Sequence, residues 1–263
     1  MAKIHWHDGH GEAVILLHGW GMNGAVWAQL VPWLQTCGLR VGVVTLPGYG
    51  GIEASSWDDN LALLAQELWR QIPCDCHLLG WSLGGLIATE MALQAPERTR
   101  SLCTIASSPC FVEQPEWPGI SAPVLARFGQ QLQQDLKKTI SDFLALQGMG
   151  SVSARADIRA LKQAIFALPL AEATTLQAGL QLLQSTDQRP QLRQLQGRWL
   201  RIYGANDALV PKTTLAQVDE YWDAPSAQAG SRQTQSIVIP EAGHAPFISH
   251  FDLVSRALAA FYQ

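Results

Sequence analysis

The stretch Leu78-Leu79-Gly80-Trp81-Ser82-Leu83-Gly84-Gly85 decides the fold. The apolar run from Cys76 to Leu79 indicates a buried strand, and a helical stretch follows from Leu86 to Gln94. A serine inside Gly-x-Ser-x-Gly, between a strand and a helix, sits on a tight turn that holds its hydroxyl above the sheet. The flanking glycines permit that turn and let the helix close on the strand. We therefore predict that Ser82 is a nucleophile facing the N-terminus of a helix, the alternative being a purely structural turn.

The bulk composition excludes several classes of protein. The chain has 263 residues, enough for one large domain, and 48% of them are hydrophobic, which predicts a sizeable core. The net charge of −4 argues against a general nucleic-acid partner. No stretch approaches the ~20 apolar residues of a membrane span, and the first apolar run, 13–17, is too short for a signal peptide.

Cysteine usage indicates the compartment. Five cysteines without an export signal predict reduced thiols in a cytoplasmic protein, which we expect to be monomeric. Cys74-x-Cys76 has no second ligand pair, so we expect neither a metal nor a cofactor.

Short apolar runs alternate with segments of helical periodicity over much of the chain. The runs predict strands at 14–17, 41–46, 76–80, 101–105, 199–203 and 236–239. Helices are predicted at 58–71, 83–94 and 252–261. This alternation is typical of an α/β protein whose mostly parallel sheet carries helices on both faces.

The alternation stops between Phe111 and Gln184, where no strand pattern occurs. Three helical stretches are predicted there, at 123–147, 153–168 and 172–183. We interpret 111–184 as a helical cap inserted into a core formed by 1–110 and 185–263. A small, polar stretch from Asp223 to Thr234 is expected to be a surface loop.

A serine nucleophile needs a base, and seven histidines compete for that role. His244 follows the last predicted strand, which is where the base stands when the catalytic order is Ser, acid, His. His77 lies inside a strand and is expected to pack there, whereas His250 is expected to cap a helix or lie on the surface. Three more precede the core, and no carboxylate or cysteine set completes a metal site with them: His5, His7 and His10. The seventh, His18, belongs to the loop after the strand at 14–17.

The base must be oriented by an acid, for which Asp207 is the candidate because it follows the strand at 199–203. Asp219 and Glu220 fall in the next helix, and Glu241 is too close to His244 in sequence to reach its far ring nitrogen easily.

An oxyanion hole needs two N–H donors. One is expected from Leu83, the residue after the nucleophile, and the other from Trp20 within His18-Gly19-Trp20-Gly21. The other interpretation of Trp20 is that its ring lines the pocket, and both can hold, since the donor belongs to the backbone.

These residues together resemble the α/β-hydrolases and, more narrowly, the carboxylesterases of biotin synthesis. The general resemblance is carried by Leu16 to Gly21, Leu46 to Gly50, Gly80 to Gly85 and Gly243 to Phe247. The closer resemblance is carried by Ala106-Ser107-Ser108-Pro109-Cys110-Phe111, Glu116 to Ile120, Phe143-Leu144-Ala145-Leu146-Gln147 and Ala245 to His250. One departure is Thr45, which stands where the family usually has Asp.

The resemblance implies an activity and a partner. The substrate would be the methyl ester of a pimeloyl chain on acyl-carrier protein, cleaved through a serine acyl-enzyme. Substrate-binding residues would be Trp20, Ser82, Leu83, Phe143, Leu144, Ala145, Leu146, Gln147 and His244.

The predicted cap carries its own charge pattern. Residues 121–168 hold six basic and three acidic residues in an otherwise acidic chain. Arg155, Arg159 and Lys162 share a helical face, which together with Lys138 could dock an acidic carrier protein. The alternative is an ordinary solvated face, and Asp142, where the family tends toward a basic residue, weakens the docking interpretation.

Two other functions stay open at this point. One is a broad short-chain carboxylesterase without a carrier partner. The other is a non-catalytic binding module with this fold, against which the intact catalytic set argues.

Overall fold

The computed structural model describes residues 2–54, 60–148, 154–223 and 232–263. In these residues a seven-stranded sheet has the order β1-β3-β2-β4-β5-β6-β7. Its strands are Lys3–His7, Ala13–Leu17, Arg40–Thr45, Cys76–Trp81, Thr99–Ile105, Arg198–Gly204 and Gln233–Ile239, numbered β1 to β7. Only β1 runs antiparallel to its neighbour, β3, so the prediction of a mostly parallel sheet is confirmed.

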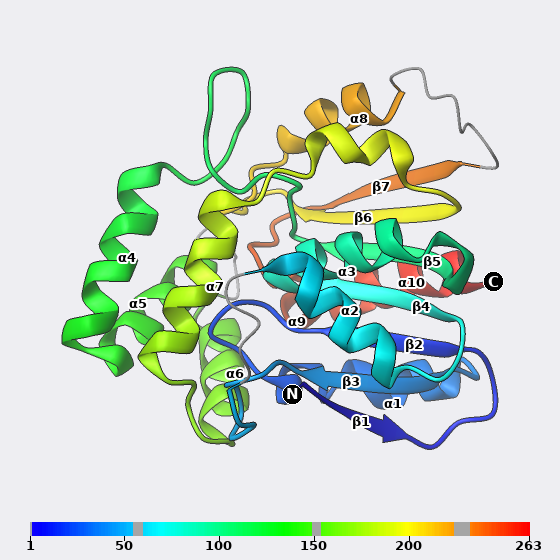
Figure 1. Ribbon diagram of the computed structural model, residues 1–263, viewed down its shortest axis with the longest axis horizontal. Helices are drawn as coiled ribbons and strands as arrows, with labels where there is room; N and C mark the ends of the chain where they lie inside the picture. The colour runs from blue at the N-terminus through cyan, green and yellow to red at the C-terminus, as the bar shows by residue number, and fades with distance from the viewer. Residues whose placement is uncertain (1, 55–59, 149–153, 224–231) are drawn as a thin grey trace.

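Helices cover both faces of the sheet (Figure 1). On one face lie α2 and α3, and on the other α1 and α10. The helices outside the 111–184 stretch are α1 (Leu30–Thr36), α2 (Leu61–Gln71), α3 (Leu83–Gln94), α8 (Thr214–Asp223), α9 (Pro246–Ser249) and α10 (Phe251–Tyr262). Short 3-10 helices occur at Gly24–Trp27, Pro96–Arg98 and Arg189–Gln194.

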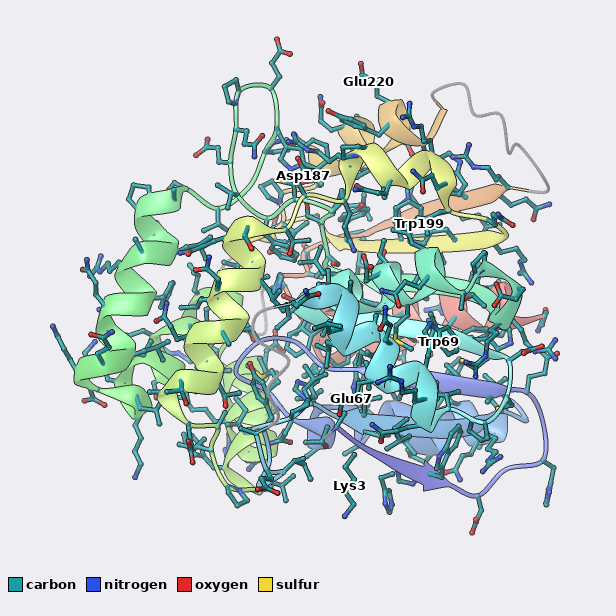
Figure 2. The ribbon with its side chains drawn as sticks, viewed as in Figure 1. Lys3, Glu67, Trp69, Asp187, Trp199 and Glu220 are labelled. Atoms are coloured by element: carbon teal, nitrogen blue, oxygen red, sulfur yellow. The ribbon has the colours of Figure 1, made fainter. Side chains whose placement is uncertain are left out.

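The buried faces of the sheet form a continuous apolar core. Strand β2 is buried along its whole length, and so is β4. Trp199 lies on β6 (Figure 2). Its indole donates to Thr104 Oγ1 of β5 at 3.1 Å and packs against Trp222 of α8, so it connects three elements.

Four helices follow β5 and lie together beside the sheet (Figure 1). They are α4 (Ala122–Gln134), α5 (Leu136–Gly148), α6 (Ala154–Phe166) and α7 (Ala173–Ser185). The helical character predicted for this stretch is thus present, and we refer to α4–α7 as the cap helices.

Some expectations need correction. The single helix predicted at 123–147 is wrong, because Asp135 adopts an extended conformation and its carboxylate accepts a hydrogen bond from the N–H of Lys138, which starts a new helix. Strand β1 and helix α1 were not predicted. His250 occupies the N-cap position of α10, but its side chain makes no capping hydrogen bond. Most of the loop predicted at 223–234 lies outside the described residues.

The turn between β4 and α3 is built on three close backbone approaches. A Cβ placed on Gly80 would lie 2.2 Å from the carbonyl oxygen of Gly84, and one on Gly84 would lie 2.1 Å from that of Leu17. A Cβ on Gly85 would meet Ser107 Oγ at 2.3 Å. Any side chain at these positions would force backbone or a strand-end loop to move.

We predict that Gly84→Ala lowers the free energy of unfolding by about 3 kcal/mol or more, since the new methyl group collides with backbone rather than with a flexible side chain. The matched control is Gly129→Ala in α4, where a Cβ meets only the Gln177 side chain, at 3.3 Å. That change should be neutral or stabilising by up to about 1 kcal/mol, because alanine is the better helix former. Urea unfolding of both variants measures the difference, and equal effects would contradict the assignment.

Candidate active site

Ser82 stands between β4 and α3 in a backbone conformation that non-glycine residues rarely adopt, with φ 55° and ψ −120°. Such a conformation costs on the order of 1–3 kcal/mol and persists only where the surroundings enforce it. Here the enforcing contacts are the close approaches at Gly80 and Gly84, together with the hydrogen bond from the Ser82 N–H to the carbonyl of Ile105. The sharp turn directs Oγ toward the loops that follow the other strands.

The structure brings the three predicted side chains together. Ser82 Oγ lies 2.9 Å from His244 Nε2, and His244 Nδ1 lies 2.8 Å from Asp207 Oδ2. Because a carboxylate only accepts, the imidazole carries its proton on Nδ1, which leaves Nε2 to accept the hydroxyl proton of Ser82. This is the relay geometry of a hydroxyl nucleophile, its base and the group that orients the base.

Backbone packing explains why the acid and the base meet. The N–H groups of Ala205 and Asn206, after β6, donate to the carbonyls of Ile239, the last residue of β7, and of Ala242 in the loop that follows it, both at 2.9 Å. A Cβ on Gly204 would lie 2.1 Å from the Gly243 carbonyl oxygen, so the two loops touch directly.

The Asp207 carboxylate is itself held in place. Its Oδ1 accepts the N–H groups of Leu209 and Val210 at 2.8 and 3.0 Å, which turns Oδ2 toward His244. The rejected acid Asp219 is engaged elsewhere, since it pairs with the buried Arg201 at 2.5 Å. Glu241 is exposed.

The loop after β2 lies directly against the nucleophile. A Cβ built on Gly19 would be 3.3 Å from Ser82 Cβ, so the backbone at Gly19 and Trp20 borders the space above Oγ. Leu83 begins α3, and the N–H groups of a first helical turn have no partner inside the helix. Both predicted oxyanion donors thus belong to segments that flank Ser82.

His18 fixes the start of that loop. Its Nε2 accepts the N–H of Leu46 at 3.2 Å, and its Nδ1–H donates to the Gly19 carbonyl at 2.9 Å. Complete burial lowers the pKa of His18 to about 4, so the ring is neutral at neutral pH, as its acceptor role at Nε2 requires. Sequence reasoning did not single out this role.

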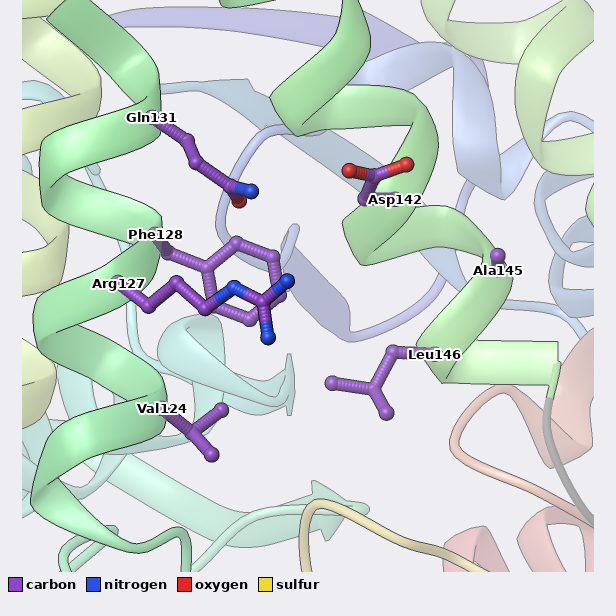
Figure 3. A pocket seen from close by; sticks show the side chains of 7 residues that line it. All are labelled: Val124, Arg127, Phe128, Gln131, Asp142, Ala145 and Leu146. Atoms are coloured by element: carbon purple, nitrogen blue, oxygen red, sulfur yellow. The ribbon is translucent and has the colours of Figure 1, made fainter.

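The predicted acyl-pocket residues divide into two groups. Phe143 packs edge-on against Trp20 with ring centres 4.6 Å apart, and the carbonyl of Gln147 accepts the N–H of His244 at 3.2 Å. Leu144 is buried, whereas Ala145 is exposed and Leu146 is half-buried. Ala145 and Leu146 line a groove of about 380 Å³ between α4 and α5, together with Val124, Arg127, Phe128, Gln131 and Asp142 (Figure 3).

The Gln147 side chain is the polar group that stands out beside the triad. Both its amide oxygen and its amide nitrogen are buried without a hydrogen-bond partner in the part of the chain that the structure describes. Leaving such a group unpaired costs on the order of 1–3 kcal/mol per atom, which makes it a candidate ligand contact.

Three other histidines make contacts away from Ser82. His77, as expected, packs in β4, where its ring nitrogens contact Ser101 Oγ and Glu12 Oε2 at 2.8 and 2.9 Å. His5 and His7 lie on the edge strand β1 with their rings in contact. Among the described residues, no cluster of three or more metal-ligating side chains occurs.

Comparisons with known proteins identify the family of the chain. A sequence profile of the alpha/beta hydrolase fold matches residues 12–251. The chain belongs to the α/β-hydrolase family. It is 49% identical to a protein of Aeromonas hydrophila over 92% of each chain, and 46% identical to one of Edwardsiella ictaluri over 99% of this chain and 98% of the other. Both are named pimeloyl-[acyl-carrier protein] methyl ester esterase, which groups the chain with the carboxylic ester hydrolases.

Solved structures extend the likeness of the fold. An esterase from Exiguobacterium antarcticum superposes with a TM-score of 0.83 at 19% identity, covering 99% of this chain and 94% of that one. An enol-lactonase from Burkholderia xenovorans gives 0.81 at 15% identity, over 99% and 96%. Because one fold hosts different reactions, these neighbours bear on architecture alone. No helix among the described residues has the length and apolarity to cross a bilayer.

We predict a pH dependence of stability that is due to His18. Its pKa is about 4 in the folded chain against 6.5 when unfolded, so its stabilising contribution is complete above pH 6.5 and is lost as the pH falls toward 4. Between pH 7 and pH 4.5 the loss should be about 2–3 kcal/mol, from 1.36 kcal/mol per pKa unit.

The measurement is urea unfolding at both pH values for the wild type and for His18→Gln, whose amide can offer an acceptor to the Leu46 N–H but does not titrate. The variant should lose less stability on acidification. Identical losses in the two proteins would show that His18 is not the responsible group.

Proposed function

We propose that this chain hydrolyses the methyl ester of a pimeloyl group carried by acyl-carrier protein, with Ser82 as nucleophile, His244 as base and Asp207 as the orienting acid. The observation that carries the proposal is the pair of hydrogen bonds that His244 makes, to Ser82 and to Asp207. The substrate is inferred from relatives of that name that match this chain at 43–49% identity over nearly its full length.

The chemistry follows from the geometry. As Ser82 Oγ attacks the ester carbonyl, His244 Nε2 takes the hydroxyl proton, and Asp207 stabilises the resulting imidazolium without being protonated. The N–H groups of Trp20 and Leu83 are the proposed donors to the oxyanion, and one such donor is worth about 3–4 kcal/mol of barrier. The tetrahedral intermediate then collapses: its C–O bond to the methoxy group breaks, the methoxy oxygen takes the proton from His244 and leaves as methanol, and the acyl group stays on Ser82 Oγ. A water molecule, deprotonated by the same nitrogen, releases the free carboxylate and restores Ser82.

The proposed acyl pocket lies between core and cap helices. Trp20, Leu83, Phe143 and Leu144 supply its apolar surface, and the unpartnered amide of Gln147 is proposed to bind a polar group of the substrate. Ser82 and His244 are only 3% and 1% exposed, so the proposed substrate meets them inside the protein and not on its surface. We propose 111–184 as the cap and 1–110 with 185–263 as the core, because α4–α7 fall within the first range except for Ser185, the last residue of α7, and all seven strands of the described sheet fall outside it.

Carrier docking is proposed for the basic face of α6. Arg155 and Arg159 are exposed there, and Lys162 is half-buried. Lys138 on α5 is weaker support, because its ammonium pairs with Asp142 at 2.5 Å. A locally basic face on an acidic chain would steer an acidic carrier protein toward the cap.

The compartment and assembly stay predictions. All five cysteines are free thiols, which agrees with the cytoplasm as the proposed location. A monomer acting without a metal, cofactor, nucleic acid or membrane remains the expectation.

We predict that Ser82→Ala lowers kcat for ester hydrolysis by about 10⁶-fold, since the relay then has no nucleophile. Steady-state kinetics on a free methyl ester and on pimeloyl-carrier methyl ester check this. Turnover that survives the substitution would mean that the nucleophile is another residue, and no turnover by the wild type would favour a non-catalytic binding role.

We predict that reversing Arg155, Arg159 and Lys162 to Glu lowers kcat/KM on the carrier-bound ester by about tenfold or more at low salt, because it removes electrostatic attraction. Hydrolysis of a small free methyl ester should be unchanged, since these side chains lie on the outside of the cap. Equal losses on both substrates would remove the docking interpretation, and no loss on either would favour a broad carboxylesterase without a carrier partner.

A further inference from the structure

The indole of Trp20 links the loop beside the nucleophile to a cap helix. Its Nε1–H donates to the carbonyl of Leu176 in α7 at 2.7 Å, across 156 residues of sequence. The ring is completely buried, and Phe143 of α5 packs against it edge-on. The residue whose backbone N–H is a proposed oxyanion donor therefore has its side chain hydrogen-bonded to one cap helix and packed against another.

Gly179 makes this contact possible. A Cβ built on it would lie 2.6 Å from Trp20 Cδ1, 3.1 Å from Trp20 Nε1 and 2.9 Å from the Tyr49 hydroxyl oxygen. Glycine inside a helix costs about 1 kcal/mol relative to alanine, so a mid-helix glycine calls for a packing reason. The reason here is that α7 rests directly on the indole.

A second close approach fixes the same helix on the core. Gly48 has φ +80°, and a Cβ there would lie 2.2 Å from Thr175 Oγ1 of α7. Helix α7 is thus seated on two core loops at once, the turn after β3 and the loop that carries Trp20.

The loop around Trp20 is held at Gly19, whose carbonyl accepts hydrogen bonds from His18 Nδ1–H at 2.9 Å and from the Met22 N–H at 3.2 Å. Gly19 and Gly21 flank Trp20, and Gly21 has φ +72°. Among the described residues, the Met22–Gly19 bond is the one backbone hydrogen bond within the 19–22 segment. A backbone donor between two glycines keeps its direction only if something holds its side chain, and oxyanion stabilisation is sensitive to displacements of about 1 Å.

We propose that α7 positions the Trp20 backbone N–H for oxyanion stabilisation. It does so through the Leu176 carbonyl, which accepts the indole N–H, and through Gly179, whose lack of a side chain leaves room for the indole ring. Leu176 and Gly179 are positioning residues, since they act through Trp20 and do not touch substrate. The oxyanion hole is then complete only while α7 is seated on the core, so the cap takes part in the chemical step as well as in substrate binding. This inference rests on the proposed esterase function.

Two variants test it. Trp20→Phe keeps an aromatic ring against Phe143 but removes the Nε1–H, and Gly179→Ala pushes the indole away from its seat. Gly129→Ala in α4 is the matched control, a glycine-to-alanine change in a cap helix without a contact to Trp20. Thermal unfolding checks that each variant is folded.

The readouts are kcat and KM on a small free methyl ester, and the inhibition constant of an alkyl trifluoromethyl ketone. Addition of Ser82 Oγ to that ketone transfers the hydroxyl proton to His244 and places an oxyanion in the hole. Both variants should lower kcat by about tenfold to a hundredfold with KM changed less than threefold. The affinity for the ketone should fall in proportion to kcat/KM, and the control should match the wild type.

Folded variants that keep kcat and ketone affinity within twofold of the wild type would overturn the proposal. A rise in KM alone would also overturn it, because the indole would then only line the acyl pocket. Should Gly179→Ala fail to fold, Trp20→Phe decides. The wild type shows separately whether the proposed function itself fails. If the protein is not a serine esterase, the wild type will neither hydrolyse the ester nor bind the ketone.

Discussion

The close contact between the backbone of α3 and the backbone at the end of β2 is the constraint on which the site depends. Gly84 meets the carbonyl of Leu17, and Gly80 meets that of Gly84, at distances that no side chain would allow. These contacts hold Ser82 at φ 55° and place the Gly19–Trp20 backbone beside it. Nucleophile, helix N-terminus and oxyanion loop are therefore fixed by one packing arrangement, and its strain is offset by the buried sheet around it.

The order of the strands in the sheet places Asp207 and His244 beside Ser82. Parallel strands end at the same edge, so residues that follow β6 and β7 arrive beside the residue that follows β4. The hydrogen bonds of Ala205 and Asn206 to the end of β7 and the loop after it lock the two loops together, which sets the separation of Asp207 and His244. The relative positions of Ser82, Asp207 and His244 thus follow from the strand ends, while the cap helices lie beside the sheet (Figure 1).

Much of this could be predicted from the sequence because it follows from local patterns. Strand ends, glycine spacing and chain order were sufficient to name Ser82, Asp207 and His244, which the structure brings within hydrogen-bond distance. The break at Asp135 was missed because helical periodicity continues across it, and only the carboxylate cap marks the new start. The short edge strand β1 was missed because its alternation includes histidines and a tryptophan and has no long apolar run.

Other features could not be predicted because they depend on residues far apart in the chain. The contact of Trp20 with Leu176 spans 156 residues, and the unpartnered amide of Gln147 is recognised only once its surroundings are known. Fold alone would not have supplied the reaction either, since an esterase and an enol-lactonase superpose on this chain equally well at 15–19% identity.

The central claim is that Ser82 is activated by His244, and covalent labelling tests it most directly. The protein would be treated with an alkyl fluorophosphonate, which loses fluoride when a serine oxygen attacks phosphorus, and the adduct would be mapped by peptide mass spectrometry. The account predicts one adduct on Ser82, formed at least about 10³-fold more slowly in His244→Ala, because the hydroxyl then has no base. An adduct on a different residue, or labelling of Ser82 at the same rate without His244, would contradict it.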